Sequence, residues 1–243
     1  MKVIVLGTGS GVPVPDRNGS GYLFDTGKVQ LLIDAGEGTS GRLAGLGIDQ
    51  NRIEYIIITH THPDHIAGLF PLLQFMHLMD RRKSLRIYIP EGTRPGFESI
   101  LKYFQIYPDR WEYKIYIQSM TSRDRIDCKE VMISPIPNDH IPPSEEKYNS
   151  FSLLISEKNG GSVLLTSDVN SLDHLKRDDL NPDLLITEYT HIEMEEIVYY
   201  AKSKGIERIL ISHIKPEAEG EAQKEAGLEN MVIFTHDGYI TEV

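Results

Sequence analysis

The sequence contains almost no cysteine: Cys128 stands alone among 243 residues. A single cysteine cannot form an internal disulfide. Its charged neighbours, Asp127 and Lys129, predict a surface or strand-edge position for the thiol. Because disulfides are rare in reducing compartments, their exclusion favours a cytoplasmic protein.

Long hydrophobic runs are also missing. No apolar stretch approaches the roughly 18 residues that a membrane-spanning helix needs. The apolar part of Met1–Gly7 is too short for a secretory signal and runs into a glycine-rich turn, so it predicts a first strand. We therefore expect no membrane segment.

Positive charge is scarce, with 25 Lys and Arg against 36 Asp and Glu and a net charge of −11. General affinity for nucleic acid depends on clustered Lys and Arg that displace counterions from phosphates, so the charge argues against nucleic acid as a partner. Hydrophobic residues make up 40% of the chain, enough for a sizeable core. No linker or internal repeat divides the chain, which predicts one domain over residues 1–243.

The densest chemical feature is the segment Thr-His-Thr-His-Pro-Asp-His-Ile-Ala-Gly at residues 59–68. It follows an apolar run at 55–58 that predicts a buried strand. Alternate residues of an extended segment point the same way, so two of the histidines can aim at one cation and the next Asp and His at a second. Imidazole and carboxylate without thiolate suit a catalytic site for zinc, manganese or iron better than a closed structural zinc site. The four candidate ligands are His60, His62, Asp64 and His65.

This segment resembles the His-x-His-x-Asp-His signature of the metallo-β-lactamase superfamily. The resemblance implies an α/β fold, a four-layer αββα sandwich, and two divalent ions, zinc foremost with manganese or iron as alternatives. Three later residues, each at a predicted strand end or an adjoining turn, match further ligand positions: His140, Asp168 and His213. By the resemblance, the first ion would be held by His60, His62 and His140, the second by Asp64, His65 and His213, and Asp168 would bridge them. Asp34, in the superfamily's first motif, would accept the ring N–H of a ligand histidine.

Strands and helices are predicted to alternate after an opening set of strands joined by short glycine-containing turns, which favours sheets covered by helices. The predicted strands cover residues 2–6, 21–25, 29–34, 55–59, 86–89, 113–118, 131–136, 151–156, 162–166, 184–187, 208–212, 231–234 and 239–242. The predicted helices cover residues 38–46, 64–80, 94–105, 191–204 and 216–226. The fourth helix opens with Thr190–Glu193, which has the form of a capping box.

The segment Leu184–His191 resembles the phosphodiesterase branch of the superfamily, which includes ribonuclease Z and the phosphoribosyl cyclic phosphate phosphodiesterases. The resemblance implies that His191, oriented by Glu188, contacts the phosphoryl or leaving oxygen, while Asp64 orients the attacking hydroxide. At the first turn of the predicted helix, His191 would also have free backbone N–H groups beside it that suit an anion. The alternative is that His191 is an ordinary exposed residue at the start of the helix and Glu188 only a charge at the end of a strand.

One departure from ribonuclease Z bears on the substrate. That enzyme carries a long tRNA-binding arm between its third and fourth metal motifs, but here only residues 141–167 separate them, and two predicted strands occupy most of that length. We therefore expect a small linear or cyclic phosphodiester as substrate. The alternatives are a ribonuclease Z-like endonuclease, in which a homodimer could supply the clamp, and a thioester or lactone hydrolase. A non-catalytic metal-binding protein would be expected to have lost a ligand.

Two further segments are open to two interpretations. The glycine-rich Leu6–Pro13, with Arg17 and Asn18 after it, resembles the start of ribonuclease Z, and either lets backbone approach a ligand or simply forms a tight turn. The aromatic residues at 103–116 either line a pocket for a base or sugar, or belong to the local core. The histidines at 77, 174 and 236 lack a strand-end context and are expected to be structural.

Overall fold

The first half of the chain builds one sheet and the last strand completes it. The structure, a computed structural model, describes residues 1–143, 147–216 and 231–243, and within these ranges the strands form two seven-stranded sheets. The first sheet has the order β14-β1-β2-β3-β4-β5-β6. It runs antiparallel from β14 to β3 and parallel from β3 to β6. Its strands are β1 (Lys2–Gly7), β2 (Gly21–Asp25), β3 (Gln30–Ile33), β4 (Ile53–Ile57), β5 (Leu85–Pro90), β6 (Ile115–Met120) and β14 (Ile240–Glu242).

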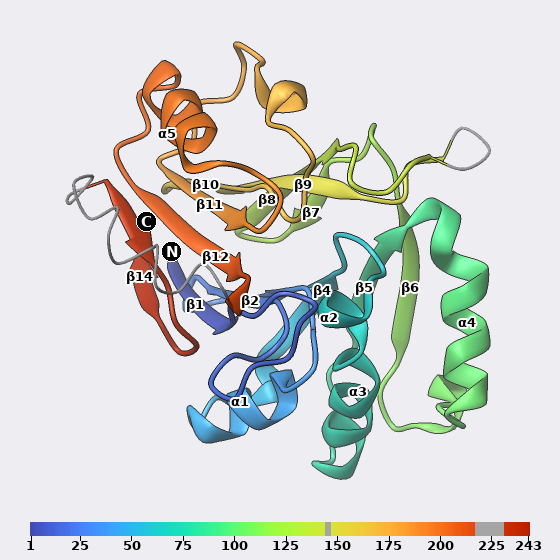
Figure 1. The fold of residues 1–243 in the computed structure, drawn as a ribbon. Coiled ribbons are helices and arrows are strands. Elements are labelled where there is room, and N and C mark those ends of the chain that lie inside the picture. The colour runs from blue at the N-terminus through green and yellow to red at the C-terminus, as the bar shows by residue number, and fades with distance from the viewer. Residues whose placement is uncertain (144–146, 217–230) are drawn as a thin grey trace.

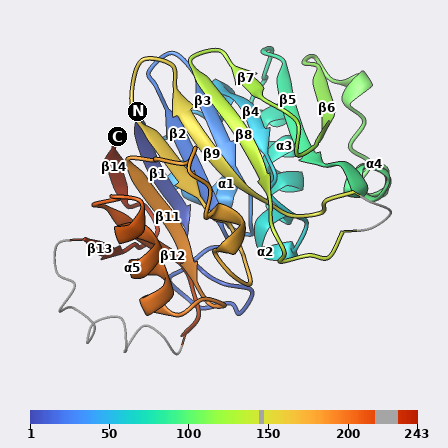
Figure 2. The same ribbon diagram turned by 90° about the horizontal axis from the view of Figure 1, so that it is seen from above.

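The second sheet repeats this plan in the order β13-β12-β11-β10-β9-β8-β7. It is antiparallel from β7 to β10 and parallel from β10 to β13. Its strands are β7 (Ile126–Cys128), β8 (Val131–Pro137), β9 (Phe151–Glu157), β10 (Ser162–Leu165), β11 (Leu184–Tyr189), β12 (Ile209–Ile214) and β13 (Val232–Phe234). Seen from above, the strands of one sheet lie over those of the other (Figure 2).

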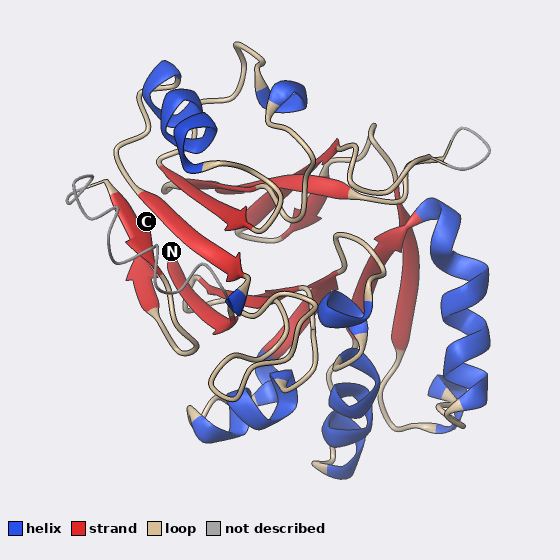
Figure 3. Cartoon of the chain, viewed as in Figure 1, coloured by secondary structure: helices blue, strands red, loops and turns tan. Residues whose placement is uncertain are grey.

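Helices cover the outer face of each sheet, which gives four layers (Figures 1 and 3). The helices are α1 (Thr39–Gly45), α2 (Pro63–Ile66), α3 (Leu69–Leu78), α4 (Arg94–Tyr103) and α5 (Met194–Ser203). The predicted αββα sandwich is confirmed. Within the part of the chain that the structure describes, no helix has the length and apolarity needed to cross a membrane.

Three apolar clusters hold the layers together, and alternation along each strand explains them. In β1, Val3 and Val5 face the cluster between the sheets, whereas Ile4 and Leu6 face the cluster under α1 and α3. A third cluster lies between the second sheet and α5. Strands buried on both faces need apolar residues at successive positions, which is why the strands read as continuous hydrophobic runs.

The predicted helix over 64–80 is wrong in its middle, because α2 and α3 are separate helices on either side of Gly68. The backbone at Gly68 approaches Gly36 so closely that an added Cβ would lie 2.0 Å from the Gly36 carbonyl oxygen. That contact comes from a segment more than thirty residues away in the chain, so helical periodicity did not reveal the break. The helix predicted over 216–226 falls, apart from Pro216, outside the described residues.

The capping box predicted at Thr190–Glu193 is also wrong. Helix α5 begins three residues later than expected, and its N-cap residue, Glu193, makes no side-chain capping bond. The Thr190 hydroxyl instead donates to the carbonyl oxygen of His213, 2.7 Å away in β12. A contact between neighbouring strands therefore outweighs the local helix signal.

Cys128 lies in β7, the outer strand of the second sheet, so the strand-edge position is confirmed. The alternative of a surface position is wrong, because the residue is fully buried. Burial raises the pKa of its thiol to about 12.

We expect Cys128 to resist thiol reagents in the folded protein. The thiolate is the reactive form of cysteine, and burial both disfavours loss of the thiol proton and keeps the reagent away from the sulfur. Titration with 5,5′-dithiobis(2-nitrobenzoic acid) should release one equivalent of thionitrobenzoate only after unfolding in guanidinium chloride. Equally fast release from the folded protein would contradict this position.

Candidate metal centre

The structure brings all seven predicted ligands together where the two sheets meet. The loop after β4 carries His60 and His62, α2 carries Asp64 and His65, and β12 carries His213. His140 follows β8 and Asp168 follows β10. The side chains form two groups that could each hold a cation: His60, His62, His140 and Asp168, and Asp64, His65, Asp168 and His213. Within each group the candidate ligand atoms lie within 4.8 Å of one another, and Asp168 belongs to both groups.

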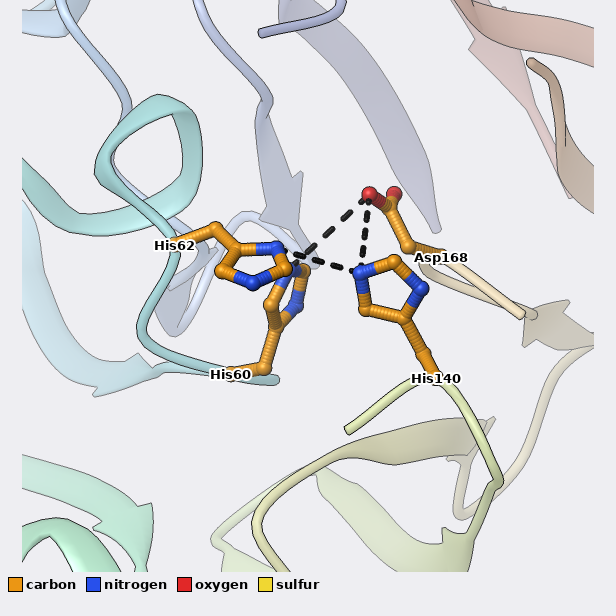
Figure 4. A group of neighbouring side chains, drawn as sticks. All are labelled: His60, His62, His140 and Asp168. Atoms are coloured by element: carbon orange, nitrogen blue, oxygen red, sulfur yellow. Dashed lines mark hydrogen bonds and ion pairs between the residues drawn. The ribbon is translucent and has the colours of Figure 1, made fainter. Parts of the chain in front are cut away.

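In the first group the ring nitrogens converge on one point (Figure 4). His62 Nδ1 lies 3.2 Å from His60 Nε2 and 3.1 Å from His140 Nε2. Asp168 Oδ2 lies 3.9 Å from His60 Nε2 and 3.7 Å from His140 Nε2. A tetrahedral ion with bonds of about 2.1 Å separates its ligands by about 3.4 Å, so these spacings fit one ion of the size of zinc.

The second group is more deeply buried. Asp168 Oδ1 lies 3.3 Å from His65 Nε2, and its Oδ2 lies 3.2 Å from His213 Nε2. Asp64 Oδ2 is 3.8 Å from both of these ring nitrogens. His65 Nε2 and Asp168 Oδ1 are buried and face each other without good hydrogen-bond geometry, and a cation bound between them would satisfy both atoms.

Electrostatics favour the metal-binding forms of His60 and Asp168 but the protonated form of His65. Burial lowers the pKa of His60, which favours the neutral imidazole. Burial alone would raise the pKa of Asp168, but His65 and His213 outweigh it and hold that pKa well below its ordinary value. Burial likewise opposes a proton on His65, but Asp168 and Asp34 hold the pKa of His65 well above its ordinary value. A cation that binds here would therefore displace a proton from His65.

Asp34 holds His65 from behind. Its Oδ2 accepts the Nδ1–H of His65 at 2.8 Å, and its two oxygens also accept the backbone N–H and hydroxyl of Thr59. A carboxylate in this position fixes the tautomer that leaves Nε2 free for a metal. Asp34 and His213 adopt positive φ angles of 56° and 49°, which non-glycine residues rarely do, so the backbone carries strain at this site.

Two hydroxyl side chains contact the rings of other candidate ligands, and a third supports one of the two; the sequence singled out none of them. Ser20 Oγ lies 3.0 Å from His213 Nδ1, and Thr59 Oγ1 lies 3.2 Å from His60 Nδ1. Ser167 bonds Thr59 at 2.8 Å. Ser20 and His213 are 193 positions apart in the chain. The only sequence signal for such residues is their place next to a predicted strand end, and many serines share that place.

Glu188 lies at the end of β11 and is 2% exposed. Its carboxylate accepts the backbone N–H groups of Val169, Thr190 and His191 at 2.8 to 2.9 Å. Both oxygens also lie 2.9 Å from His191 Nδ1. The prediction that His191 has free backbone N–H groups beside it is therefore wrong. Helix α5 begins three residues after His191, and the N–H groups of Thr190 and His191 donate to Glu188.

The ring of His191 lies beside candidate ligands of both groups. Its centroid is 5.1 Å from that of His140 and 6.4 Å from that of His213. The hydrogen bond with Glu188 raises the pKa of His191 despite partial burial. The pair thus places a ring that holds a proton readily beside both groups of ligands.

The aromatic segment lies elsewhere. Trp111 stacks on His77 of α3, with centroids 4.6 Å apart, and Tyr113 is buried with its hydroxyl on the Leu73 carbonyl oxygen. Trp111 and Phe104 line a separate cavity of about 380 Å³. The cavity beside Asp64 is lined by none of the aromatic residues at 103–116. His174 Nε2 bonds the Ser152 hydroxyl at 2.9 Å and belongs to neither group of ligands.

This fold and this cluster of histidine and aspartate are those of a metal-dependent hydrolase of the metallo-β-lactamase superfamily, and the sequence similarity to proteins named ribonuclease Z places the chain in that branch. The family model described as Anti-Pycsar protein Apyc1 matches residues 1–229, and the chain belongs to this family.

Known proteins support this placement. Ribonuclease Z of Pyrococcus furiosus is 29% identical over 237 residues, a match that covers 80% of this chain and 76% of that protein. Matches to five other ribonuclease Z proteins cover 32% to 53% of their length. The metallo-β-lactamase fold protein YhfI from Bacillus subtilis has a TM-score of 0.82 at 21% identity, covering 100% of this chain and 99% of that one. A diphosphatase from the PhnP family has a TM-score of 0.77 at 18% identity, covering 100% and 97%.

Proposed function

We propose that this chain is a phosphodiesterase with two divalent ions, acting on a small linear or cyclic phosphodiester. The observation that carries the proposal is the Glu188–His191 pair beside two ligand groups that share Asp168. In this assignment the ligands are His60, His62 and His140 for one ion and Asp64, His65 and His213 for the other. Five imidazoles and two carboxylates without thiolate suit zinc, and manganese or iron would also be accepted.

Two divalent ions bound there would activate a water near neutral pH and offset charge on the phosphoryl oxygens. The chain's own residues then orient the reaction. Asp64 would accept a hydrogen bond from the attacking group and orient it. His191 has its Nδ1 engaged by Glu188, so its Nε2 is the ring nitrogen left to contact the phosphoryl or leaving oxygen and to give up a proton there.

The second candidate is an RNA endonuclease, which the relatives named ribonuclease Z favour. Against it stand the net charge of −11 and the short connection between His140 and Asp168, residues 141–167, which contains β9 and β10. The 27 residues at 141–167 are too few to form a long protruding arm in addition to two strands.

We expect the protein to hydrolyse bis-p-nitrophenyl phosphate and to bind transfer RNA only weakly, with little change in binding between low and moderate salt. Turnover with added zinc or manganese, and filter binding of labelled precursor tRNA over a salt series, would test both parts. Site-specific cleavage of precursor tRNA would establish the RNA candidate instead, and sedimentation of the same sample would show whether a second copy supplies a clamp.

A thioester or lactone hydrolase would use the same ions without need of the Glu188–His191 pair. A panel of p-nitrophenyl phosphodiesters, acyl thioesters and lactones separates these activities. Turnover of a thioester that survives replacement of His191 would favour that class.

A further inference from the structure

A cavity of about 490 Å³ opens beside Asp64. One wall is the loop between β1 and β2, which contributes Ser10 to Gly19, and the other wall comes from Glu37 and Gly38 before α1 together with Pro63, Asp64 and Ala67. The loop passes close over the candidate ligand, since a Cβ added at Gly11 would lie 3.6 Å from Asp64 Oδ2. Whatever fills this cavity is therefore continuous with the metal centre.

A single buried carboxylate, Asp237, holds both ends of that loop. Its side chain is 2% exposed and lies in the connection between β13 and β14. Oδ1 accepts the backbone N–H and the hydroxyl of Thr8 at 2.9 and 2.7 Å. Oδ2 accepts the backbone N–H of Asn18 at 2.7 Å and a guanidinium N–H of Arg42 at 3.2 Å. Hydrogen bonds to an ionised carboxylate are stronger than neutral ones, so Asp237 is the main clamp on the loop.

The loop is also closed on itself. The backbone N–H of Gly9 donates to the carbonyl oxygen of Asn18 at 2.8 Å. Arg17 donates to the Thr8 hydroxyl at 2.7 Å and to the Thr235 carbonyl oxygen at 3.0 Å. The Arg17 guanidinium thus belongs to the same hydrogen-bond network as Asp237 and donates to groups at the start of the loop and in the segment after β13.

The charges around the cavity limit what it accepts. Glu37 is exposed and lines the wall opposite the loop. Asp64 and the cation Arg17 also line the cavity, and Arg17 donates to Thr8 and Thr235. A second anionic group would be repelled by the two carboxylates, whereas a hydroxyl or amine could donate a hydrogen bond to Glu37. The volume falls in the range of small-molecule sites, and prolines and Ala67 supply apolar surface for a ring.

We propose that Asp237 is a positioning residue that shapes, through the loop from Thr8 to Asn18, a subsite for the uncharged, hydrogen-bonding, nucleoside-sized substituent of a phosphodiester. The inference rests on the proposed phosphodiesterase function. It goes further by stating that the organic group of the substrate lies in the cavity beside Asp64. Sequence patterns gave no hint of Asp237, because its partner Thr8 is 229 positions away.

Two esters with the same leaving group test the subsite: thymidine 5′-(p-nitrophenyl phosphate), which carries a nucleoside, and methyl p-nitrophenyl phosphate, which does not. We expect Asp237→Asn to lower the ratio of kcat/KM for the thymidine ester to kcat/KM for the methyl ester about tenfold. The change should appear as a higher KM for the thymidine ester, because a looser cavity wall binds the nucleoside less tightly in both the ground state and the transition state. Metal content should stay at the parent value. Amide hydrogen exchange at Gly9 and Asn18 should become faster in the same variant.

The matched control is Asp25→Asn. Asp25 also accepts a backbone N–H, that of Gly27, and a side-chain N–H, that of Gln30, but it is the last residue of β2 and does not line the cavity. It should leave the ester ratio unchanged. Glu37→Ala, at an exposed position that does not endanger folding, should lower the ratio as Asp237→Asn does.

The outcomes separate the two proposals. Equal losses on both esters, or a loss of metal in Asp237→Asn, would make Asp237 merely structural and overturn the inference. A parent enzyme that turns over the methyl ester without preferring the thymidine ester would also overturn the inference and leave the phosphodiesterase standing. A parent enzyme that turns over neither ester would overturn the proposed function itself.

Discussion

Asp168→Ala should remove most of the bound metal and lower turnover of a phosphodiester by more than 10²-fold, because it takes a ligand from both groups at once. Loss of a residue that only supports a ligand typically costs 10 to 100-fold in metal affinity, and loss of a shared carboxylate should exceed that. Metal analysis of protein purified without chelators, together with steady-state kinetics, measures both effects.

Asp173→Ala is the matched control, since this carboxylate is exposed and pairs with Lys176 at the surface. It should keep both metal and activity. Full metal content in Asp168→Ala, with an unfolding temperature like that of the parent, would show that Asp168 does not bridge two ions.

His191→Ala should retain the metal and still lower turnover by roughly 10² to 10⁴, the range for loss of an acid–base group. The ring belongs to neither group of ligands, so its removal leaves them intact. His77→Ala, which removes a ring stacked on Trp111, serves as the control and should not change turnover. Turnover at the parent rate in His191→Ala would remove the main support for a phosphodiesterase.

Glu188→Gln refines this test. We expect a smaller loss of turnover than in His191→Ala, because the ring remains. The carboxylate also accepts the N–H of Val169, next to Asp168, so the amide should weaken metal binding as well. Titration with zinc would separate the two variants: His191→Ala should bind like the parent and Glu188→Gln less tightly.

The ligands were within reach of sequence reasoning because each stands beside a recognisable strand. His140, Asp168 and His213 follow or close apolar runs, and such runs were placed almost correctly. The short strand β7 and the break at Gly68 were not foreseen. The break depends on a contact with Gly36, and local periodicity carries no information on that contact.

The supporting residues were out of reach for the same reason. Ser20 and Asp237 act on residues roughly 200 positions away, and nothing near them in the sequence marks their partners. His191 was placed in a helix because Thr190 and Glu193 have the right spacing for a cap. The pairing of β11 with β12 gave the Thr190 hydroxyl a different acceptor.

The pairing of β14 with β1 has a consequence for how the chain is made. The two termini lie side by side, and the N-terminal ammonium donates to the Val243 carbonyl oxygen at 2.6 Å (Figure 1). During synthesis β1 (Lys2–Gly7) is made long before β14 (Ile240–Glu242), which pairs with its outer edge, and contacts of such long range are slow to form. Until then β1 presents unpaired backbone that can pair with another chain. A nascent or truncated chain without β14 should therefore aggregate through that edge, and a chaperone that binds β1 would be most useful until β14 has been synthesised.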